Sequence, residues 1–450
     1  MKTIQRRLRH GHLNIIAALM CIPLLVSCAS VEAGQGHSLA SPLQTCYPQS
    51  TPVPGPVIFH PTPGQAGLYA FAGPGIYRFS TAGGHLTPIW LYRMHECIVL
   101  TPTIVPGLAG PGFELPSIQD GLTVADNMVF FGVNEKTGSW VDLYAVHADT
   151  GSLAWKVRIT DSSGIGGLLV LHDLIYIETG DAVHSSPPVN IISALSVRDG
   201  SVRWTYRYPL NITDTGMGLS SAGDGAVYVT GSNSLFALNA TSGKQLWQAN
   251  LPQDQGNAVA SLQDGVLYVT SSAGCFNCVI QPSSSLVYAF DLATGTQRWQ
   301  SQRFDGFLTP PMEARGIIYV GSQDGHLHAL RASDGMQLWT SYAGGELHVT
   351  PQVMNGLVCV GTAPFLGKDN PNTTATHLIA FDATTGHQKW SSTFPSTQSS
   401  GYEPILSGNG TLYTTSGNKR IAILQATTGK LLQQYSVLMS GPVFGLALAP

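Results

Sequence analysis

The sequence predicts an all-β protein, and three observations support this class. Six segments share an apolar stretch, a polar turn with glycine, and a tryptophan four residues after that glycine. Short strand-like runs, rich in β-branched and aromatic residues, precede these segments. In several cases an Asp-Gly or Asn-Gly pair joins two such runs, and its glycine accepts the positive φ that a hairpin turn requires. No helical pattern separates the units, so each unit reads as four short antiparallel strands.

The tryptophans recur at a nearly constant spacing. They lie 40 to 52 residues apart, which is the period of propeller blades or solenoid units, and four-stranded units in series predict a β-propeller. Aromatic side chains bury about 150 to 250 Å² each, so we expect a structural role for these tryptophans in packing one blade against the next. The residues so assigned are Trp90, Trp155, Trp204, Trp247, Trp299, Trp339 and Trp390.

Two turns mark each unit. The turn between its first two strands contains Asp224-Gly225, Asp264-Gly265, Asn355-Gly356 or Asn409-Gly410, with Arg315-Gly316 as a weaker version. The turn before each tryptophan strand ends in a glycine that we expect in the left-handed region. Both turns are tight, so the predicted strands are short and closely connected.

The predicted propeller covers residues 67–450 and has eight blades. Six blades end at Trp390, and a seventh carries Gln433 in the tryptophan position. Residues 67–97 resemble a degenerate eighth blade, and the apolar segment 441–450 is expected to close the ring as its innermost strand. Seven blades are the alternative if residues 67–97 form only an arm.

The N-terminal residues predict export and anchoring. Residues 1–27 carry four cationic residues and no acidic one, followed by an apolar run too short to span a bilayer, which is typical of a signal peptide. The run ends in LVSC, which resembles a lipobox and implies lipidation of Cys28. The alternative is an ordinary signal peptide that is cut elsewhere. Residues 28–66 are rich in Pro and Ser and read as a tether.

Charge argues against nucleic acid as a partner. The net charge is −4, and it becomes −8 once the four cations of the leader are removed. Only 11% of the residues are charged, and no basic stripe is present. Polar neutral side chains must therefore cover most of the surface.

The repeat resembles the pyrroloquinoline-quinone-type (PQQ-like) propeller repeat over residues 67–450. Within it, an exported lipoprotein with eight blades resembles the propeller subunits of the outer-membrane β-barrel assembly machine. That resemblance implies a non-catalytic scaffold without a cofactor. The family also includes quinoprotein dehydrogenases, and the resemblance to these implies pyrroloquinoline quinone with calcium.

Candidate ligands for such a site are few. Calcium requires hard oxygen ligands, and Glu313 and Glu403 stand beside predicted innermost strands, where they either face the channel or are solvated rim groups. His326 and His328 alternate on one strand, so they face the same way. They either share a metal or, as we favour, make polar contacts between blades.

The cysteines favour disulfides over redox or zinc chemistry. Cys275 and Cys278 form a CxxC in a predicted loop, without a helix start to lower a thiol pKa or a second ligand pair for zinc, so a loop-closing disulfide is expected. By pairing parity, Cys46 and Cys97 form a second candidate pair. Cys359 replaces tyrosine in a strand and is expected to be buried.

The sequence thus predicts an exported, membrane-anchored protein that faces the periplasm or the cell exterior. We expect a monomer that binds envelope proteins through the loops of the propeller and contacts the membrane through its lipid only. We assign no catalytic, cofactor-binding or metal-binding residue. A quinone- and calcium-dependent dehydrogenase or cofactor-binding sensor is the alternative.

Overall fold

The computed structural model describes a set of residues that all belong to one compact unit, Cys46–Pro450. These residues are 57–58, 67–72, 75–82, 85–93, 122–134, 140–160, 165–181, 189–209, 218–231, 234–251, 257–272, 284–363, 375–395, 405–408, 410–415, 420–437 and 443–449. No helix among them is long and apolar enough to cross a membrane. Cys28, Cys46, Cys97, Cys275, Cys278 and Glu403 lie outside the described residues.

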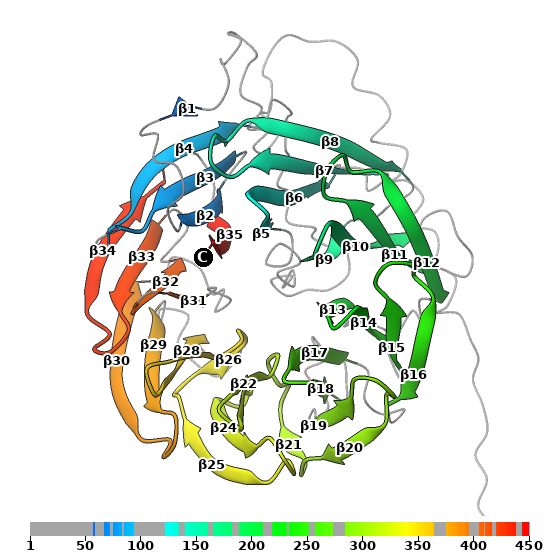
Figure 1. Cartoon of the computed structure of the whole chain (residues 1–450). Helices are drawn as coiled ribbons and strands as arrows, with labels where there is room; N and C mark the ends of the chain where they lie inside the picture. The colour runs from blue at the N-terminus through cyan, green and yellow to red at the C-terminus, as the bar shows by residue number, and fades with distance from the viewer. Residues whose placement is uncertain are drawn as a thin grey trace, which may run out of the picture. The chain divides into compact units, whose positions relative to one another are not determined.

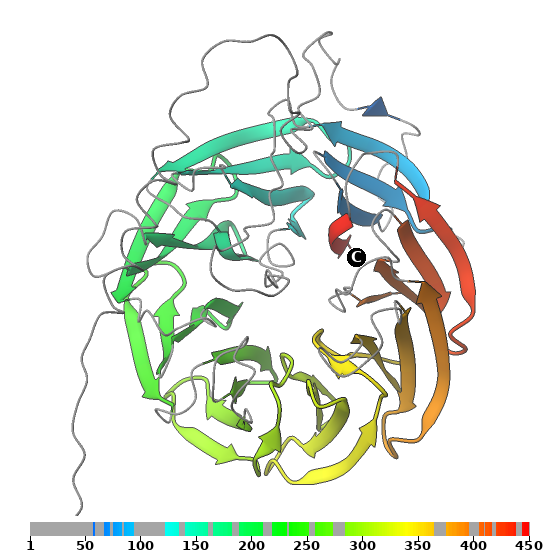
Figure 2. The same cartoon turned by 180° about the vertical axis from the view of Figure 1, so that it is seen from behind.

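The unit is an eight-bladed β-propeller, which confirms the predicted fold class and blade count (Figures 1 and 2). From the innermost strand outward, blade 1 comprises β35 (Val443–Ala449), β2 (Gly67–Ala72), β3 (Gly75–Ser80) and β4 (Thr87–Arg93), with β1 (Val57–Ile58) beside β4. Blade 2 comprises β5 (Leu122–Ala125), β6 (Met128–Asn134), β7 (Trp140–His147) and β8 (Leu153–Thr160). Blade 3 comprises β9 (Ile165–Leu171), β10 (Leu174–Asp181), β11 (Val189–Ser196) and β12 (Val202–Pro209), and blade 4 comprises β13 (Gly218–Gly223), β14 (Ala226–Gly231), β15 (Ser234–Asn239) and β16 (Gln245–Asn250).

Blades 5 to 8 follow the same order. Blade 5 comprises β17 (Asn257–Gln263), β18 (Val266–Ser272), β19 (Ser284–Asp291) and β20 (Gln297–Gln300), and β21 (Phe304–Asp305) also pairs with β19. Blade 6 comprises β22 (Met312–Ala314), β23 (Ile317–Gly321), β24 (His326–Arg331) and β25 (Gln337–Tyr342), and blade 7 comprises β27 (Gln352–Met354), β28 (Leu357–Ala363), β29 (Ala375–Asp382) and β30 (Gln388–Pro395), with β26 (Glu346–Leu347) also paired with β28. Blade 8 comprises β31 (Ile405–Gly408), β32 (Thr411–Thr415), β33 (Arg420–Gln425) and β34 (Leu431–Ser436).

The ring closes as the sequence predicts. β35, the last strand of the chain, pairs antiparallel with β2 and forms the innermost strand of blade 1. Leu446 of β35 lies opposite Ala70, and both side chains belong to the core between blades 8 and 1. The first blade is therefore built from both ends of the propeller sequence, so the ring cannot open without breaking this sheet.

The hydrophobic core is divided among the blade junctions. Eight clusters of buried side chains are present in the described part, and each joins two successive blades. At junction 7/8, for example, Cys359 and Leu378 of blade 7 pack with Leu412 of blade 8. A blade therefore buries its two faces only when both neighbours are present.

The connections separate onto two faces because the strands of a blade alternate in direction. The turns between the first and second strands and between the third and fourth strands lie at one end, which we call the turn face. The connections between the second and third strands and from one blade to the next lie at the opposite end, the loop face. Every blade therefore presents the same two kinds of connection to each face.

The turn face is built from strained but regular turns. Asp224 and Gly225 have φ of 50° and 75°, as the hairpin signal predicts, and Gly243 in the second turn of the same blade has φ of 68°. Ala240 N donates a hydrogen bond of 2.9 Å to Gly225 O and thereby links the two turns. His172 adopts a φ of 54° in the corresponding turn of blade 3, although this turn contains no glycine.

Candidate functional site

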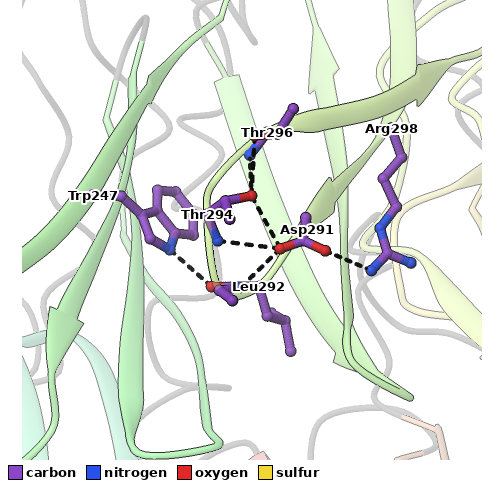
Figure 3. A network of polar contacts seen from close by, with 7 residues as sticks. Trp247, Asp291, Leu292, Thr294, Thr296 and Arg298 are labelled. Carbon is purple, nitrogen blue, oxygen red and sulfur yellow. Dashed lines mark hydrogen bonds and ion pairs between the residues drawn. The ribbon is translucent and has the colours of Figure 1, made fainter.

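The tryptophans and the turns of the next blade form one repeated contact, which we call the tryptophan dock. In junction 4/5, Trp247 Nε1 donates a hydrogen bond of 2.8 Å to Leu292 O (Figure 3). Asp291 Oδ1 accepts from Thr294 N at 3.1 Å, and its Oδ2 lies 2.8 Å from Arg298 Nη2, so the turn is held in place. The dock thus joins one blade to the backbone of the next.

Six further docks share this geometry. Indole N–H groups donate over 2.9 to 3.2 Å from Trp90 to Ala148, Trp155 to Val197, Trp204 to Ala240, Trp299 to Ala332, Trp339 to Ala383 and Trp390 to Ala426. The turn glycine packs on the ring, and a Cβ on Gly295 would fall within 3 Å of the Trp247 indole. Glycine is required there both by the positive φ and by this close approach.

Junction 8/1 uses glutamine in place of tryptophan. Gln433 Oε1 accepts a hydrogen bond of 2.6 Å from Leu86 N, and Gln433 Nε2 donates one of 3.4 Å to Leu86 O. The ring is thus completed by a polar clamp on one backbone residue. All eight junctions have a side chain of the outermost strand bonded to the backbone of the next blade, so these residues serve the fold.

The loop-face half of junction 3/4 departs from the repeat. In the second strand, the position two residues after the central aromatic, or after Cys359 in blade 7, is small in most blades, being Thr230, Thr270, Gly321 or Gly361. Small residues fit there because the next blade comes close, as where Gly321 faces Leu347. In blade 3 this position is occupied by Glu178, which is buried, with 4% of its surface exposed. A carboxyl group therefore lies between two blades.

Three donors hold the Glu178 carboxyl group. Oε1 accepts from Tyr208 OH at 2.7 Å and from Asn190 Nδ2 at 3.2 Å, both in blade 3. Oε2 accepts from Leu219 N of blade 4 at 2.7 Å. Asn190 Nδ2 also lies 3.2 Å from Tyr208 OH. Four strands, β10 to β13, thus meet at one buried acid.

Burial governs the protonation of this group. Loss of solvation raises the pKa of Glu178 above its ordinary value, although the hydrogen bonds from Tyr208 and Leu219 oppose the shift. A Cβ added to Gly166 or Gly218 would lie 3.4 Å from Glu178 Oε2. The carboxyl group is therefore flanked by two glycines of the innermost strands.

The two histidines lie in blade 6. Their rings stack at 6.0 Å, and His328 Nδ1 is 3.1 Å from Thr340 Oγ1 on the outermost strand. Burial lowers the pKa of His328 to about 4, so this ring is neutral at neutral pH. His326 Nδ1 lies 3.2 Å from Asp324 Oδ2. Both polar contacts therefore lie within blade 6, one to the outermost strand and one to the connection between β23 and β24, and not between blades as predicted.

The remaining predicted candidates have local roles where they are described. Glu313 Oε1 accepts from Gly316 N at 2.6 Å and so caps its own hairpin. Cys359 is fully buried as a free cysteine, and burial raises the pKa of its thiol to about 12. Within the described part of the chain, no three His, Cys, Asp or Glu side chains gather as metal ligands.

Sequence reasoning missed Glu178. Its segment reads IYIETG, and aligning it with VYVTGS of blade 4 places an acid where the repeat has threonine. That mismatch was the available signal. Its partners Asn190, Tyr208 and Leu219 were not identifiable, because they lie on three other strands whose register the sequence does not state.

The chain matches the profile of the family described as "Outer membrane protein assembly factor BamB" over residues 103–279 and 283–442. It is 22% identical over 370 residues to tetrathionate hydrolase of Acidithiobacillus ferrooxidans, covering 74% of this chain and 67% of that protein. It is 31% identical to quinohemoprotein alcohol dehydrogenase of Comamonas testosteroni over 35% of this chain, but spans 23% of that protein.

A solved structure supports the fold. BamB from Moraxella catarrhalis superposes with a TM-score of 0.51 at 18% identity, covering 77% of this chain and 92% of that one. At this identity the likeness concerns the fold alone, and it agrees with the propeller seen in Figure 1.

Proposed function

Because the chain belongs to the BamB family of outer membrane protein assembly factors, we propose that it is an exported, lipid-anchored propeller that acts as a non-catalytic scaffold for envelope proteins. Cys28 would carry the lipid, residues 28–66 would act as the tether, and the loop face would bind the partner.

The observation that carries the proposal is the difference between the two faces. The turn face is held by tight turns, such as those at Asp224 and Gly243, whose polar groups bond to each other or to the preceding blade. On the loop face, the connections between second and third strands differ in length and sequence, from two residues between β14 and β15 to eleven between β28 and β29. Variable loops on a rigid scaffold are where binding sites are commonly found.

The test is site-specific photocrosslinking in cells. A photoreactive amino acid is placed at Asn250 or Asp305, which are exposed near the loop-face ends of outer strands. Ser242 and Thr294, exposed in the turn face, are the matched controls. We expect discrete crosslinks to envelope proteins from the loop-face positions only. Equal labelling from both faces, or none from either, would contradict a loop-face scaffold.

Anchoring is tested separately. Cys28→Ala should release the protein from the membrane fraction without changing its thermal unfolding, because the propeller does not contain this residue. Retention of the variant in the membrane fraction would show that the lipid on Cys28 is not the anchor.

The alternative is a quinone- and calcium-dependent dehydrogenase, favoured by the 31% identity to the quinohemoprotein enzyme. The described residues do not fit such a calcium site well. Among the described residues, Glu178 is a buried acid beside two innermost strands, and its two oxygens already accept three hydrogen bonds. Titration with pyrroloquinoline quinone in calcium buffer, followed by tryptophan fluorescence, decides: saturable binding reversed by a chelator favours this alternative over the scaffold.

A further inference from the structure

The outermost strand of each blade leaves one edge of its sheet without a neighbour inside that blade. Such an edge offers backbone donors and acceptors to any extended chain. In blade 1 this edge is already occupied. β1 pairs antiparallel with β4, with Val57 opposite Leu91 and Ile58 opposite Trp90 (Figure 1). The fold therefore accepts a fifth, uncharged strand at an outer edge.

The other outer strands differ in how they protect this edge. Charged residues, especially lysine, discourage strand addition. The residue before the tryptophan is Arg203 in β12, Arg298 in β20 and Lys389 in β30, and β8 carries Lys156 and Arg158. Three outer strands have leucine at that position and contain no charge: β16 with Leu246, β25 with Leu338 and β34 with Leu432.

Among these three strands, β25 has the most apolar exposed face. Its exposed positions are Leu338, Thr340 and Tyr342, with Met336 directly before the strand. Met336 is 58% exposed, Leu338 41% and Tyr342 57%. The corresponding rows become polar after leucine in the other two strands, with Gln248 and Asn250 in β16 and Gln434 and Ser436 in β34.

Neighbouring side chains fix this row. The Tyr342 ring lies 5.2 Å from the His326 ring, and Thr340 Oγ1 contacts His328 Nδ1 at 3.1 Å. His328 is in turn 4.5 Å from the Phe304 ring of blade 5. The exposed face of β25 is therefore supported by ordered aromatic and imidazole rings, so that little conformational entropy is lost when a partner covers it.

We propose that the outer edge of β25 is a docking strand for an extended, uncharged segment of a partner polypeptide, which adds to blade 6 as β1 adds to blade 1. The register of β1 on β4 defines the expected pairing, with partner residues opposite Trp339 and Thr340. The partner residue opposite Thr340 lies on the exposed face, between Leu338 and Tyr342 diagonally, and an apolar or β-branched side chain fits there. This surface is separate from the loop face of the proposed function.

The experiment measures binding of a fluorescein-labelled peptide in which threonine and valine alternate. We expect saturable binding to the wild type, and slowed amide exchange in β25 but not in β16. Leu338→Lys, which copies the lysine that blade 7 has at this position, should weaken binding at least ten-fold. Leu246→Lys makes the same change of charge in β16 and should leave the affinity unchanged.

Several outcomes would overturn the proposal. These are absence of peptide binding, equal weakening by Leu246→Lys and Leu338→Lys, or unchanged exchange in β25 on binding. The same holds if the peptide with lysine in place of each valine binds equally well. If sedimentation shows dimers that Leu338→Lys dissociates, the occupant is a second copy of this chain and the proposed partner segment is wrong.

Discussion

The turn-face half of a blade junction and its loop-face half obey different rules. In the turn-face half, a tryptophan from one blade bonds to a turn carbonyl of the next, as Trp247 does to Leu292, in seven of the eight junctions. In the loop-face half, the contact changes from junction to junction. Gly321 lies against Leu347 at junction 6/7, whereas the Glu178 carboxyl group bonds to Leu219 at junction 3/4.

The difference separates what the ring requires from what a single blade is free to vary. Closing eight blades demands one geometry between neighbours, so the residues that set it repeat. The other half tolerates a buried acid, a close glycine or a longer connection because the docks already hold the blades. The residues that differ from blade to blade, which are the ones able to give specific binding, therefore lie mainly toward the loop face.

Removing a dock should have the largest effect. Trp247→Ala deletes an indole that fills junction 4/5 and its bond to Leu292, and should lower the free energy of unfolding by about 3 kcal/mol. Trp247→Phe keeps most of the apolar contact and loses the hydrogen bond, so about 1 kcal/mol is expected. Urea unfolding measures both. If the two substitutions cost the same, ring packing does not dominate the dock.

Crowding the dock should be the next largest effect. Gly295→Ala adds a Cβ within 3 Å of the Trp247 ring at a residue with φ of 69°, and should cost about 2 kcal/mol. The matched control is Gly265→Ala in the same blade, with φ of 73° and no atom within 4 Å of the added carbon. It carries only backbone strain, about 1 kcal/mol. Equal losses in urea would show that contact with the indole is unimportant.

The loop-face half of junction 3/4 should respond to pH. Because the pKa of Glu178 is raised in the folded state, ionisation of the buried carboxyl group costs stability as pH rises through the folded pKa. Glu178→Gln keeps an acceptor for Leu219 N and cannot ionise, so the stability of the variant should rise relative to that of the wild type as pH increases.

Unfolding midpoints in urea from pH 5 to pH 9 provide the measurement. A difference between wild type and Glu178→Gln that does not change with pH would mean that Glu178 is already ionised in the folded protein at pH 5, which contradicts a raised pKa. Glu178→Ala is the control for the hydrogen bonds. It leaves Leu219 N and Tyr208 OH without their acceptor and should destabilise at every pH.

The two halves also differ in how much the sequence predicts. The turn-face half, which contains the tryptophan dock, follows from local sequence signals. The tryptophan of one blade and the positive-φ glycine that packs on it from the next blade recur in a fixed order, as Trp204 and Gly243 do. The acid at Glu178 depends on which strands meet, on a register shift between Glu178 and Thr179 in the pairing with β9, and on a contact to the next blade. None of these is contained in one segment of sequence.

Junction 8/1 offers the smallest and sharpest comparison, since Gln433 replaces the indole there. Gln433→Ala removes two hydrogen bonds to Leu86 and little apolar area, so about 1 kcal/mol is expected, well below the loss for Trp247→Ala. Gln433→Glu retains the acceptor for Leu86 N but places a carboxylate beside Leu86 O, so it should fall between Ala and wild type. If Gln433→Ala lowers the free energy of unfolding in urea as much as Trp247→Ala does, the polar clamp at the closure of the ring is as important to stability as a packed tryptophan. Blade 1, including β35 and β2, would then depend on that clamp to stay in place.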